Sequence, residues 1–284
     1  MTVYFNGRYM SKDEVRISPD DRGWLFGDGV YEVIRTYNRR LFRLESHLAR
    51  LSRSLKELRL PFDKVEGLGT VCAELLARNT VPTDEASIYL QITRGAAPRY
   101  HGFPAPGTPP TVYACVQPLK ADLEGQQKGI KAILVSDNRW GRCDVKSVAL
   151  LANVLAFQRA LDEGAQEAVF VRDGLVTEGS HSNAFAVVDG VVRTAPLGGL
   201  VLPGVTREVV LEVCTAEGVR VDQGPLPEAA FIGAQEAFVT GTGAEIMPIV
   251  KLGDRPVGDG KPGPVTKRLQ RAFEAFVASL SRRT

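Results

Sequence analysis

Strand patterns and helix patterns alternate along this chain, and that alternation limits its fold more than any other feature of the sequence. Two short extended runs flank Asn6-Gly7, and two more flank Asn38-Arg39-Arg40, which is the pattern of antiparallel hairpins. Leucines then recur at helical spacing over 46–59, and Pro61 follows just beyond. The chain therefore begins with antiparallel strands and continues into a helix.

The rest of the chain continues this alternation. Further helices are expected over 68–76, 148–163, 205–217 and 264–280. Strands are expected over 87–93, 111–117 and 130–136, with hairpin turns at Asp173-Gly174 and Asp189-Gly190. No internal repeat is visible.

Length and one polar segment divide the chain. At roughly 150 residues per domain, a chain of 284 residues suggests two domains. The segment 119–126 is polar and has few branched side chains, so we interpret it as a linker. It would join a small domain over 1–118 to a larger domain over 127–284.

Composition and charge exclude several classes of function. Apolar residues make up 44% and charged residues 24%, as in globular proteins. The 35 basic and 33 acidic side chains are interspersed and give a net charge of +2, which argues against nucleic-acid binding. The sequence shows neither a signal-peptide pattern nor an apolar run long enough to span a membrane. Four isolated cysteines and three histidines favour neither a zinc site nor a disulfide framework, so we expect a soluble, cytoplasmic protein with reduced thiols and no metal.

Two charged residues are candidates for chemistry. Lys146 lies between a predicted strand and a predicted helix, where a lone lysine is usually a solvated surface residue. The alternative is an amine whose pKa is lowered by nearby arginines and an apolar pocket, so that it can form a Schiff base. Glu178 lies in the small polar segment 177–183, which is either an ordinary hairpin loop or the site of a carboxylate that keeps a pyridine nitrogen protonated.

Two small-residue segments are candidates for binding a phosphate. The segment 202–207 opens directly onto a predicted helix, so its first backbone amides would point at an anion. The segment 240–243, Thr-Gly-Thr-Gly, follows a predicted strand. Neither is a Walker A or dinucleotide-binding motif, and taken separately each is more often a plain helix cap or turn.

Taken in order, five motifs resemble the class IV, fold-type IV, pyridoxal-phosphate aminotransferases. They are Asp21-Arg22-Gly23, Phe26-Gly27-Asp28-Gly29-Val30-Tyr31-Glu32, Lys146 in its context, Thr177-Glu178-Gly179-Ser180 with Ser182-Asn183, and Pro203-Gly204-Val205-Thr206-Arg207. The likeness covers nearly the whole chain. Within the family, the 92–101 and 139–147 stretches resemble the D-amino acid aminotransferases. The resemblance implies an α/β (α+β) fold with a smaller N-terminal α/β domain and a larger, β-barrel-like C-terminal domain.

The resemblance also implies roles for individual residues. Lys146 would be the Schiff-base lysine of pyridoxal 5′-phosphate, and the acid and base that moves the substrate proton. Glu178 would hold the pyridine nitrogen. The other implied cofactor contacts are Arg50, Val205, Thr206 and Thr242 around the phosphate, and Leu202 on the ring.

Three residues would bind the α-carboxylate of the substrate: Tyr31, Arg99 and His101. A guanidinium can hold a carboxylate with two charge-assisted hydrogen bonds. Positions i and i+2 of an extended segment, such as Arg99 and His101, point the same way. In this family such a loop reaches the neighbouring subunit's site, which implies a homodimer, whereas an isolated pair of this kind would be an ordinary mobile loop.

The chain departs from the D-amino acid pattern at three positions. Gly241 and Gly243 stand where hydroxyl residues are usual, and His181 replaces a small residue. These changes bear on how the cofactor is held and on which substrates fit.

The implied reaction is a ping-pong exchange of an amino group between a D-amino acid, such as D-alanine, and a 2-oxo acid, such as 2-oxoglutarate. The alternatives within the fold are a branched-chain L-amino acid aminotransferase, an (R)-amine aminotransferase and an aminodeoxychorismate lyase. A catalytically silent, ligand-binding paralogue is a further alternative, against which the joint presence of Lys146 and Glu178 argues. The preferred side chain and the amino acceptor stay open.

Overall fold

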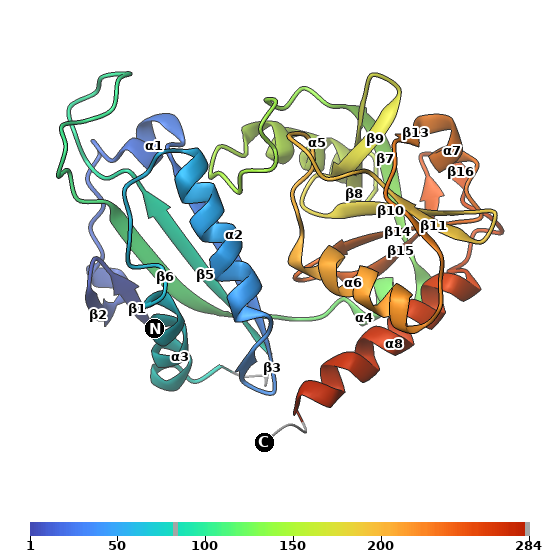
Figure 1. Cartoon of the computed structure of the whole chain (residues 1–284), viewed down its shortest axis with the longest axis horizontal. Helices are drawn as coiled ribbons and strands as arrows, with labels where there is room; N and C mark the ends of the chain where they lie inside the picture. The colour runs from blue at the N-terminus through green and yellow to red at the C-terminus, as the bar shows by residue number, and fades with distance from the viewer. Residues whose placement is uncertain (82–84, 282–284) are drawn as a thin grey trace. The chain divides into compact units, whose positions relative to one another are not determined.

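The computed structural model describes residues 1–81 and 85–281, which form two compact units (Figure 1). Unit 1 holds Met1–Lys120 together with Val145–Leu150. Unit 2 holds Ala121–Asp144 and the described residues from Leu151 onward. The chain therefore returns to unit 1 for the short segment that carries Lys146.

Unit 1 is built on a six-stranded antiparallel sheet with the order β2-β1-β6-β5-β3-β4. Its strands are β1 (Thr2–Phe5), β2 (Arg8–Ser11), β3 (Gly29–Tyr37), β4 (Arg40–Leu41), β5 (Ala86–Thr93) and β6 (Thr111–Pro118). Its helices are the 3-10 helix η1 (Lys12–Glu14), α1 (Arg22–Phe26), α2 (Leu44–Glu57) and α3 (Leu68–Arg78).

Helices α2 and α3 pack on the sheet of unit 1 (Figure 1). Leu51 and Leu55 of α2 are buried, as the leucine spacing predicts, and join Ile34, Ile88 and Leu90 in the core. Burying one such side chain contributes about 1.5–3 kcal/mol to folding. The buried face of α2 also carries polar residues, and these belong to the site described below.

Unit 2 contains a ten-stranded mixed sheet with the order β12-β11-β10-β14-β15-β7-β8-β9-β13, and β16 pairs with β15. Its strands are β7 (Ile130–Ser136), β8 (Glu167–Arg172), β9 (Leu175–Gly179), β10 (Asn183–Val188), β11 (Val191–Thr194), β12 (Val221–Asp222), β13 (Leu226–Pro227), β14 (Glu236–Gly241), β15 (Glu245–Leu252) and β16 (Arg255–Pro256). Its helices are α4 (Leu123–Lys128), α5 (Leu151–Asp162), α6 (Val205–Ala216), α7 (Glu228–Ile232) and α8 (Pro264–Ser281).

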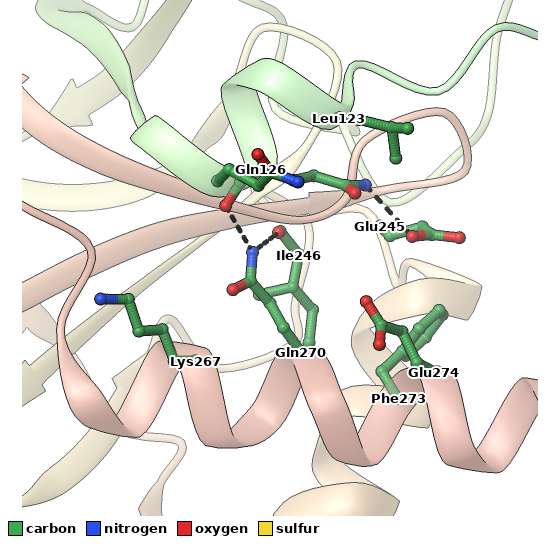
Figure 2. Close-up of a pocket in the computed structure, with 9 residues that line it drawn as sticks. Leu123, Gln126, Glu245, Ile246, Lys267, Gln270, Phe273 and Glu274 are labelled. Carbon is green, nitrogen blue, oxygen red and sulfur yellow. Dashed lines mark hydrogen bonds between the residues drawn. The ribbon is translucent and has the colours of Figure 1, made fainter.

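Helices α6 and α8 pack against each other and against β14 (Figure 1). In the sheet, the rings of Phe185 and Phe238 stack with centroids 4.8 Å apart. Figure 2 shows how α8 is tied to α4 and β15: Gln270 Nε2 donates to the carbonyl oxygens of Gln126 and Ile246, at 2.9 and 3.1 Å. The pocket beside this contact, of about 250 Å³, holds none of the predicted site residues.

The hairpin turns form where the sequence predicts them. Asn6 and Gly7 have φ of +45° and +89°, and Asp173 and Asp189 both have φ of +52°. These left-handed conformations are the ones that two-residue hairpin turns require.

Two segments differ from the sequence expectation. The helix expected over 148–163 begins at Leu151, because residues just before it pair with β3: Ser147 forms an antiparallel bridge with Val30, and Val148 N donates to Gly29 O. Part of the predicted linker 119–126 is helical, since α4 begins at Leu123. Among the described residues, no helix is both long enough and apolar enough to cross a membrane.

Candidate active site

Lys146 is held against strand β3 by backbone hydrogen bonds. Tyr31 N donates to Lys146 O at 3.0 Å, and Val148 N donates to Gly29 O at 3.0 Å. The backbone N–H of Lys146 donates to Ser54 Oγ of α2 at 3.2 Å. As a result, Lys146 Nζ lies 4.3 Å from the centroid of the Tyr31 ring. Two of the predicted site residues are thus brought together within unit 1.

Behind Tyr31, three buried polar side chains form a network between β3 and α2. Glu32 is fully buried and accepts from Arg50 Nε at 2.7 Å and from another nitrogen of the same guanidinium at 2.6 Å. His47 Nδ1 lies 2.7 Å from the second carboxylate oxygen of Glu32. Successive residues of a strand face opposite ways, so Tyr31 and Glu32 serve opposite faces of β3.

The charges in this network are set by burial and pairing. Burial alone would raise the pKa of Glu32, but the charge and hydrogen bonds of Arg50, together with those of His47, lower it to about 2. Burial lowers the pKa of His47, and the charges of Arg50 and Lys146 lower it further against the opposing effect of Glu32. Near neutral pH the network therefore holds a carboxylate, a guanidinium and a neutral imidazole, which donates its Nδ1 proton to Glu32.

Arg50 is thus a buried, oriented cation and not an exposed helix residue. Its side chain is only 6% exposed, and Glu32 holds two of its nitrogens. Removing one partner of a buried pair costs about 3–5 kcal/mol, because the other charge is left uncompensated. No role was predicted for Glu32 or His47, although the sequence places polar residues at positions 47 and 50 on the apolar face of α2.

A cavity of about 460 Å³ lies on the Tyr31 side of this sheet and is lined in part by Tyr31, Tyr89, Gln91 and Tyr113. The rings of Tyr31 and Tyr89 stack with centroids 5.9 Å apart, and Tyr89 Oη donates to Gln91 Oε1 at 2.6 Å. Burial raises the pKa of Tyr89 to about 12, so its hydroxyl stays protonated at neutral pH.

The other two residues predicted to bind the substrate carboxylate are exposed on the loop between β5 and β6. Arg99 Cζ lies 5.3 Å from the centroid of the Phe26 ring, and the centroid of the His101 ring lies 5.4 Å from it. Arg99 and His101 thus share a neighbour in α1 of their own unit, whereas Tyr31 contacts Tyr89 and Lys146.

Glu178 lies at the end of β9 in unit 2, where three donors fix its carboxylate. Arg139 donates to Oε1 at 2.5 Å, while Leu202 N and Asn183 Nδ2 donate to Oε2 at 2.8 and 3.3 Å. The contact with Leu202 brings two predicted cofactor residues together. An ionised carboxylate only accepts hydrogen bonds, so it is suited to hold a protonated ring nitrogen.

No role was predicted for Arg139, which donates to Glu178 Oε1. Burial alone would lower its pKa, but Asp137 and Glu178 outweigh that effect and raise it, so the guanidinium stays charged. Asp137 holds it through Nε and another guanidinium nitrogen, both at 2.9 Å. The only available signal was its place in the stretch 139–147 that resembles the family.

Helix α6 begins beside the Glu178 loop and presents open backbone donors. Its N-cap, Gly204, has no side chain to cap the first turn, and Val205 and Thr206 are buried there. A Cβ on Gly204 would lie 2.0 Å from Asn183 Oδ1, so a larger residue at this position would displace the Asn183 side chain. The N–H groups of a first helical turn, together with the helix dipole, attract an anion.

The neighbouring segment 240–243 supplies a further polar group. Thr240 Oγ1 is buried and has no hydrogen-bond partner within the described part of the chain. Thr242 follows in the turn between β14 and β15. A buried hydroxyl without a partner is costly unless a ligand or water satisfies it, so these residues fit an anionic group such as a phosphate.

His181, one of the departures from the D-amino acid pattern, is exposed at the rim of the Glu178 loop. Its Nδ1 lies 3.0 Å from Ser180 Oγ and 3.6 Å from the buried carboxylate of Glu167. Its ring packs edge-on against Phe157 of α5, with centroids 4.9 Å apart. Gly241 lies next to it, since a Cβ there would be 3.5 Å from His181 O.

Most of the chain matches one known protein family. Residues 29–252 match the family described as amino-transferase class IV. The chain belongs to this family. The match spans the network of Glu32, the lysine segment, the Glu178 loop and the start of α6.

Individual class IV aminotransferases are similar to this chain over nearly its full length. The D-alanine aminotransferase of Bacillus licheniformis is 41% identical over 286 residues, covering 100% of both chains. That of Staphylococcus haemolyticus is 40% identical and covers 98% of this chain and 99% of its own. The chain therefore resembles the D-amino acid members over its full length, which confirms the predicted resemblance to this group.

Solved structures of the family confirm the fold. The branched-chain amino acid aminotransferase of Escherichia coli superposes with a TM-score of 0.89 at 29% identity, covering 97% of this chain and 94% of that one. A second branched-chain amino acid aminotransferase, solved with pyridoxamine 5′-phosphate, superposes with a TM-score of 0.87 at 29% identity, covering 97% and 93%. The predicted fold-type IV architecture, with its two α/β parts, is confirmed.

Proposed function

We propose that this class IV aminotransferase exchanges an amino group between a D-amino acid, such as D-alanine, and a 2-oxo acid, such as 2-oxoglutarate, in a ping-pong cycle. The full-length identity of 38–41% to D-alanine aminotransferases carries this proposal. The solved branched-chain enzymes share the fold at 26–29% identity and do not favour the branched-chain alternative.

Pyridoxal 5′-phosphate is the cofactor that these residues fit. It needs an amine, a carboxylate for its ring nitrogen and donors for its phosphate, and the chain supplies Lys146, Glu178 and the start of α6 with the buried Thr240 hydroxyl. When bound, this cofactor supplies an electron sink that stabilises negative charge on the carbon beside the amino group.

Lys146 has the role of acid and base. Its Nζ lies over the Tyr31 ring, and its backbone is fixed on both sides by β3 and α2. A positioned amine of this kind would accept the proton from the α-carbon of the substrate and donate it to the cofactor carbon. To accept that proton, the Lys146 amine must be neutral for part of the cycle.

Glu178 holds the ring nitrogen of the cofactor, and Arg139 keeps the Glu178 carboxylate in place. The hydrogen bonds that the Glu178 carboxylate accepts from Arg139, Leu202 N and Asn183 restrict its rotation before any ligand binds. A carboxylate held in this way stabilises positive charge on the ring nitrogen more strongly than a mobile carboxylate would, because it does not have to reorient during the reaction.

The phosphate contacts we propose are Arg50, Val205, Thr206 and Thr242, with Leu202 against the ring. Arg50 is pre-oriented by its double hydrogen bond to Glu32, and the start of α6 offers backbone N–H groups. Gly241 and Gly243 leave fewer side-chain donors here than is usual in the D-amino acid group.

We further propose that Tyr31, Arg99 and His101 bind the α-carboxylate of the substrate in a cytoplasmic homodimer in which the Arg99–His101 loop serves the neighbouring subunit. The exposure of both loop residues supports this role, since they are accessible to a partner. The four cysteines are free and buried, which suits a reducing compartment.

The test is a half-reaction of the purified, cofactor-loaded protein with D-amino acids, L-amino acids and (R)-amines, followed by visible absorption. We expect D-alanine to convert the cofactor to its amine form faster than any L-amino acid. A faster reaction with L-valine or L-leucine would favour the branched-chain alternative. Reaction only with an (R)-amine, or release of pyruvate from aminodeoxychorismate, would favour the other two enzymes, and no reaction at all would favour a silent paralogue.

A further inference from the structure

The ring of Phe26, the last residue of α1, lies beside three positively charged or ionisable side chains. Arg22 Cζ is 4.8 Å from its centroid, Arg99 Cζ is 5.3 Å away, and the His101 ring centroid is 5.4 Å away at an interplanar angle of 49°. A guanidinium within about 6 Å of an aromatic centroid is attracted by the ring quadrupole. One half-buried ring thus contacts both exposed residues of the loop that we propose binds the substrate carboxylate.

Arg22 fixes the backbone on either side of His101. One of its guanidinium nitrogens donates to Tyr100 O at 2.7 Å and to Gly102 O at 3.1 Å. Arg22 is only 4% exposed, and its Nε donates to Asp28 Oδ2 at 2.8 Å. Since the two carbonyls flank His101, the position of Arg22 determines where this part of the loop lies.

The support for Arg22 is itself anchored in unit 1. Asp28 also accepts two hydrogen bonds from Arg94, at 2.8 and 3.0 Å, and Arg94 donates to the carbonyl oxygens of Leu58 and Arg59. Arg94 directly follows β5, where the loop begins. These buried, charge-assisted bonds connect the loop to the end of α2.

Helix α1 is tied to both strands that border the loop. Asp21 caps α1 by accepting from Gly23 N at 2.8 Å. The same carboxylate accepts from the hydroxyls of Thr93 at the end of β5 and Thr111 at the start of β6, at 3.0 and 2.6 Å. Arg22 and Phe26 therefore sit on a short helix that cannot shift without breaking contacts at both ends of the loop.

We propose that Phe26 and Arg22 are positioning residues that hold Arg99 and His101 in the geometry that binds a substrate carboxylate. This inference rests on the proposed function. Arg22 fixes the loop backbone, and the Phe26 ring restricts the two side chains, so that less conformational entropy is lost when the carboxylate binds. Arg22 and Phe26 thus affect only the binding of the substrate carboxylate and leave the chemistry at the amino group unchanged.

The experiment compares D-alanine with D-alaninamide, which has the same hand and side chain but lacks the negative charge. In Phe26→Leu, the face of the ring is lost while an apolar side chain of similar size remains. We expect kcat/KM for D-alanine to fall about tenfold, mainly through KM, which matches the loss of one cation–π contact. We expect kcat/KM for D-alaninamide to stay within about twofold of wild type.

Two further variants separate positioning from folding. Phe26→Tyr keeps the ring face and should retain the wild-type preference for D-alanine over D-alaninamide. Arg22→Lys keeps the charge but cannot donate to both carbonyls and Asp28 in the same planar arrangement, so it should lose the preference as Phe26→Leu does. Equal losses with both substrates, or an unchanged preference in Phe26→Leu, would overturn the inference.

The controls distinguish this inference from the proposed function. A wild-type enzyme that does not convert D-alanine overturns the proposed function. A wild-type enzyme that converts D-alanine and D-alaninamide equally well overturns the carboxylate-binding role of the loop, and with it the role of Phe26 and Arg22. A wild-type preference that survives in both Phe26→Leu and Arg22→Lys overturns only the positioning role.

Discussion

Lys146 Nζ lies 4.3 Å from the centroid of the Tyr31 ring, and the backbones of the two residues are joined by a 3.0 Å hydrogen bond from Tyr31 N to Lys146 O. The lysine is therefore placed by sheet-like pairing with β3 and not by a helix of its own. The face of an aromatic ring attracts a cation, so this contact helps to fix the position of the Lys146 side chain.

The first prediction concerns Lys146. Lys146→Ala should abolish both turnover and the visible absorption of the bound cofactor, because no other amine is proposed to attach it. Lys128→Ala is the matched control, since Lys128 is 74% exposed and pairs with Glu124 on the surface. Spectra and half-reaction rates of the two variants provide the measurement, and full transamination by Lys146→Ala would refute the assignment.

Glu178 should act on the chemistry more than on cofactor binding. Glu178→Gln keeps the shape of the side chain but removes the charge, so kcat should fall about a hundredfold or more. Retention of the cofactor after gel filtration should change little. The control is Glu163→Gln, because Glu163 is 45% exposed and pairs with Arg159 on the surface of unit 2. A near-normal single-turnover rate with D-alanine in Glu178→Gln would contradict the role.

His47 should make stability depend on pH. Its pKa is lowered in the folded protein from an ordinary value of 6.5, so the unfolded chain binds a proton that the folded chain does not. The resulting stabilisation is present above about pH 6.5 and is lost as pH falls, with a slope of up to about 1.4 kcal/mol per pH unit. The stabilisation contributed by the lowered pKa of Glu32 is lost at more acidic pH, as the pH falls from the ordinary pKa of 4.5 to the folded-state pKa of about 2.

Urea denaturation between pH 7 and pH 5 measures this effect. His47→Asn should show a shallower fall in the free energy of unfolding than wild type. His181→Asn is the matched control, because the His181 side chain is 59% exposed. An identical slope in His47→Asn and wild type would mean that His47 binds its proton equally in both states.

Arg99 should determine which hand of substrate is accepted. In the proposed homodimer, Arg99→Ala removes one partner of a buried, charged hydrogen-bonded pair, so D-alanine should bind about 2–5 kcal/mol more weakly. L-amino acids, which react slowly with the wild type, should be affected less. The measurement is the ratio of the D-alanine and L-alanine half-reaction rates, and an unchanged ratio would show that Arg99 is an ordinary loop residue.

The proposed exchange of loops between subunits gives a complementation test. A heterodimer of one Lys146→Ala chain and one Arg99→Ala chain contains one site with an intact lysine and an intact loop if the loop acts on the partner. Its activity should then be about half that of wild type, since a two-fold dimer has two equivalent sites. If the loop acts on its own chain, the heterodimer should show only about half the activity of the Arg99→Ala homodimer.

Local features of the chain could be predicted from the sequence because their causes are local. The turn at Asn6-Gly7 follows from the left-handed conformations that Asn and Gly adopt readily. The leucine spacing on α2 predicted its buried apolar residues. The order of the motifs was sufficient to identify the family and to predict roles for Lys146 and Glu178, because each motif is a short run of adjacent residues.

Contacts between distant segments were decided by the tertiary structure alone. Arg50 is paired with Glu32, 18 positions earlier, and Glu178 with Arg139, 39 positions earlier. The segment at Lys146 is not helical, because its backbone groups pair with β3 across more than 100 residues of chain. Helical periodicity over 148–163 reports only local preference, and hydrogen bonds to a distant strand outweigh it once the sheet has formed.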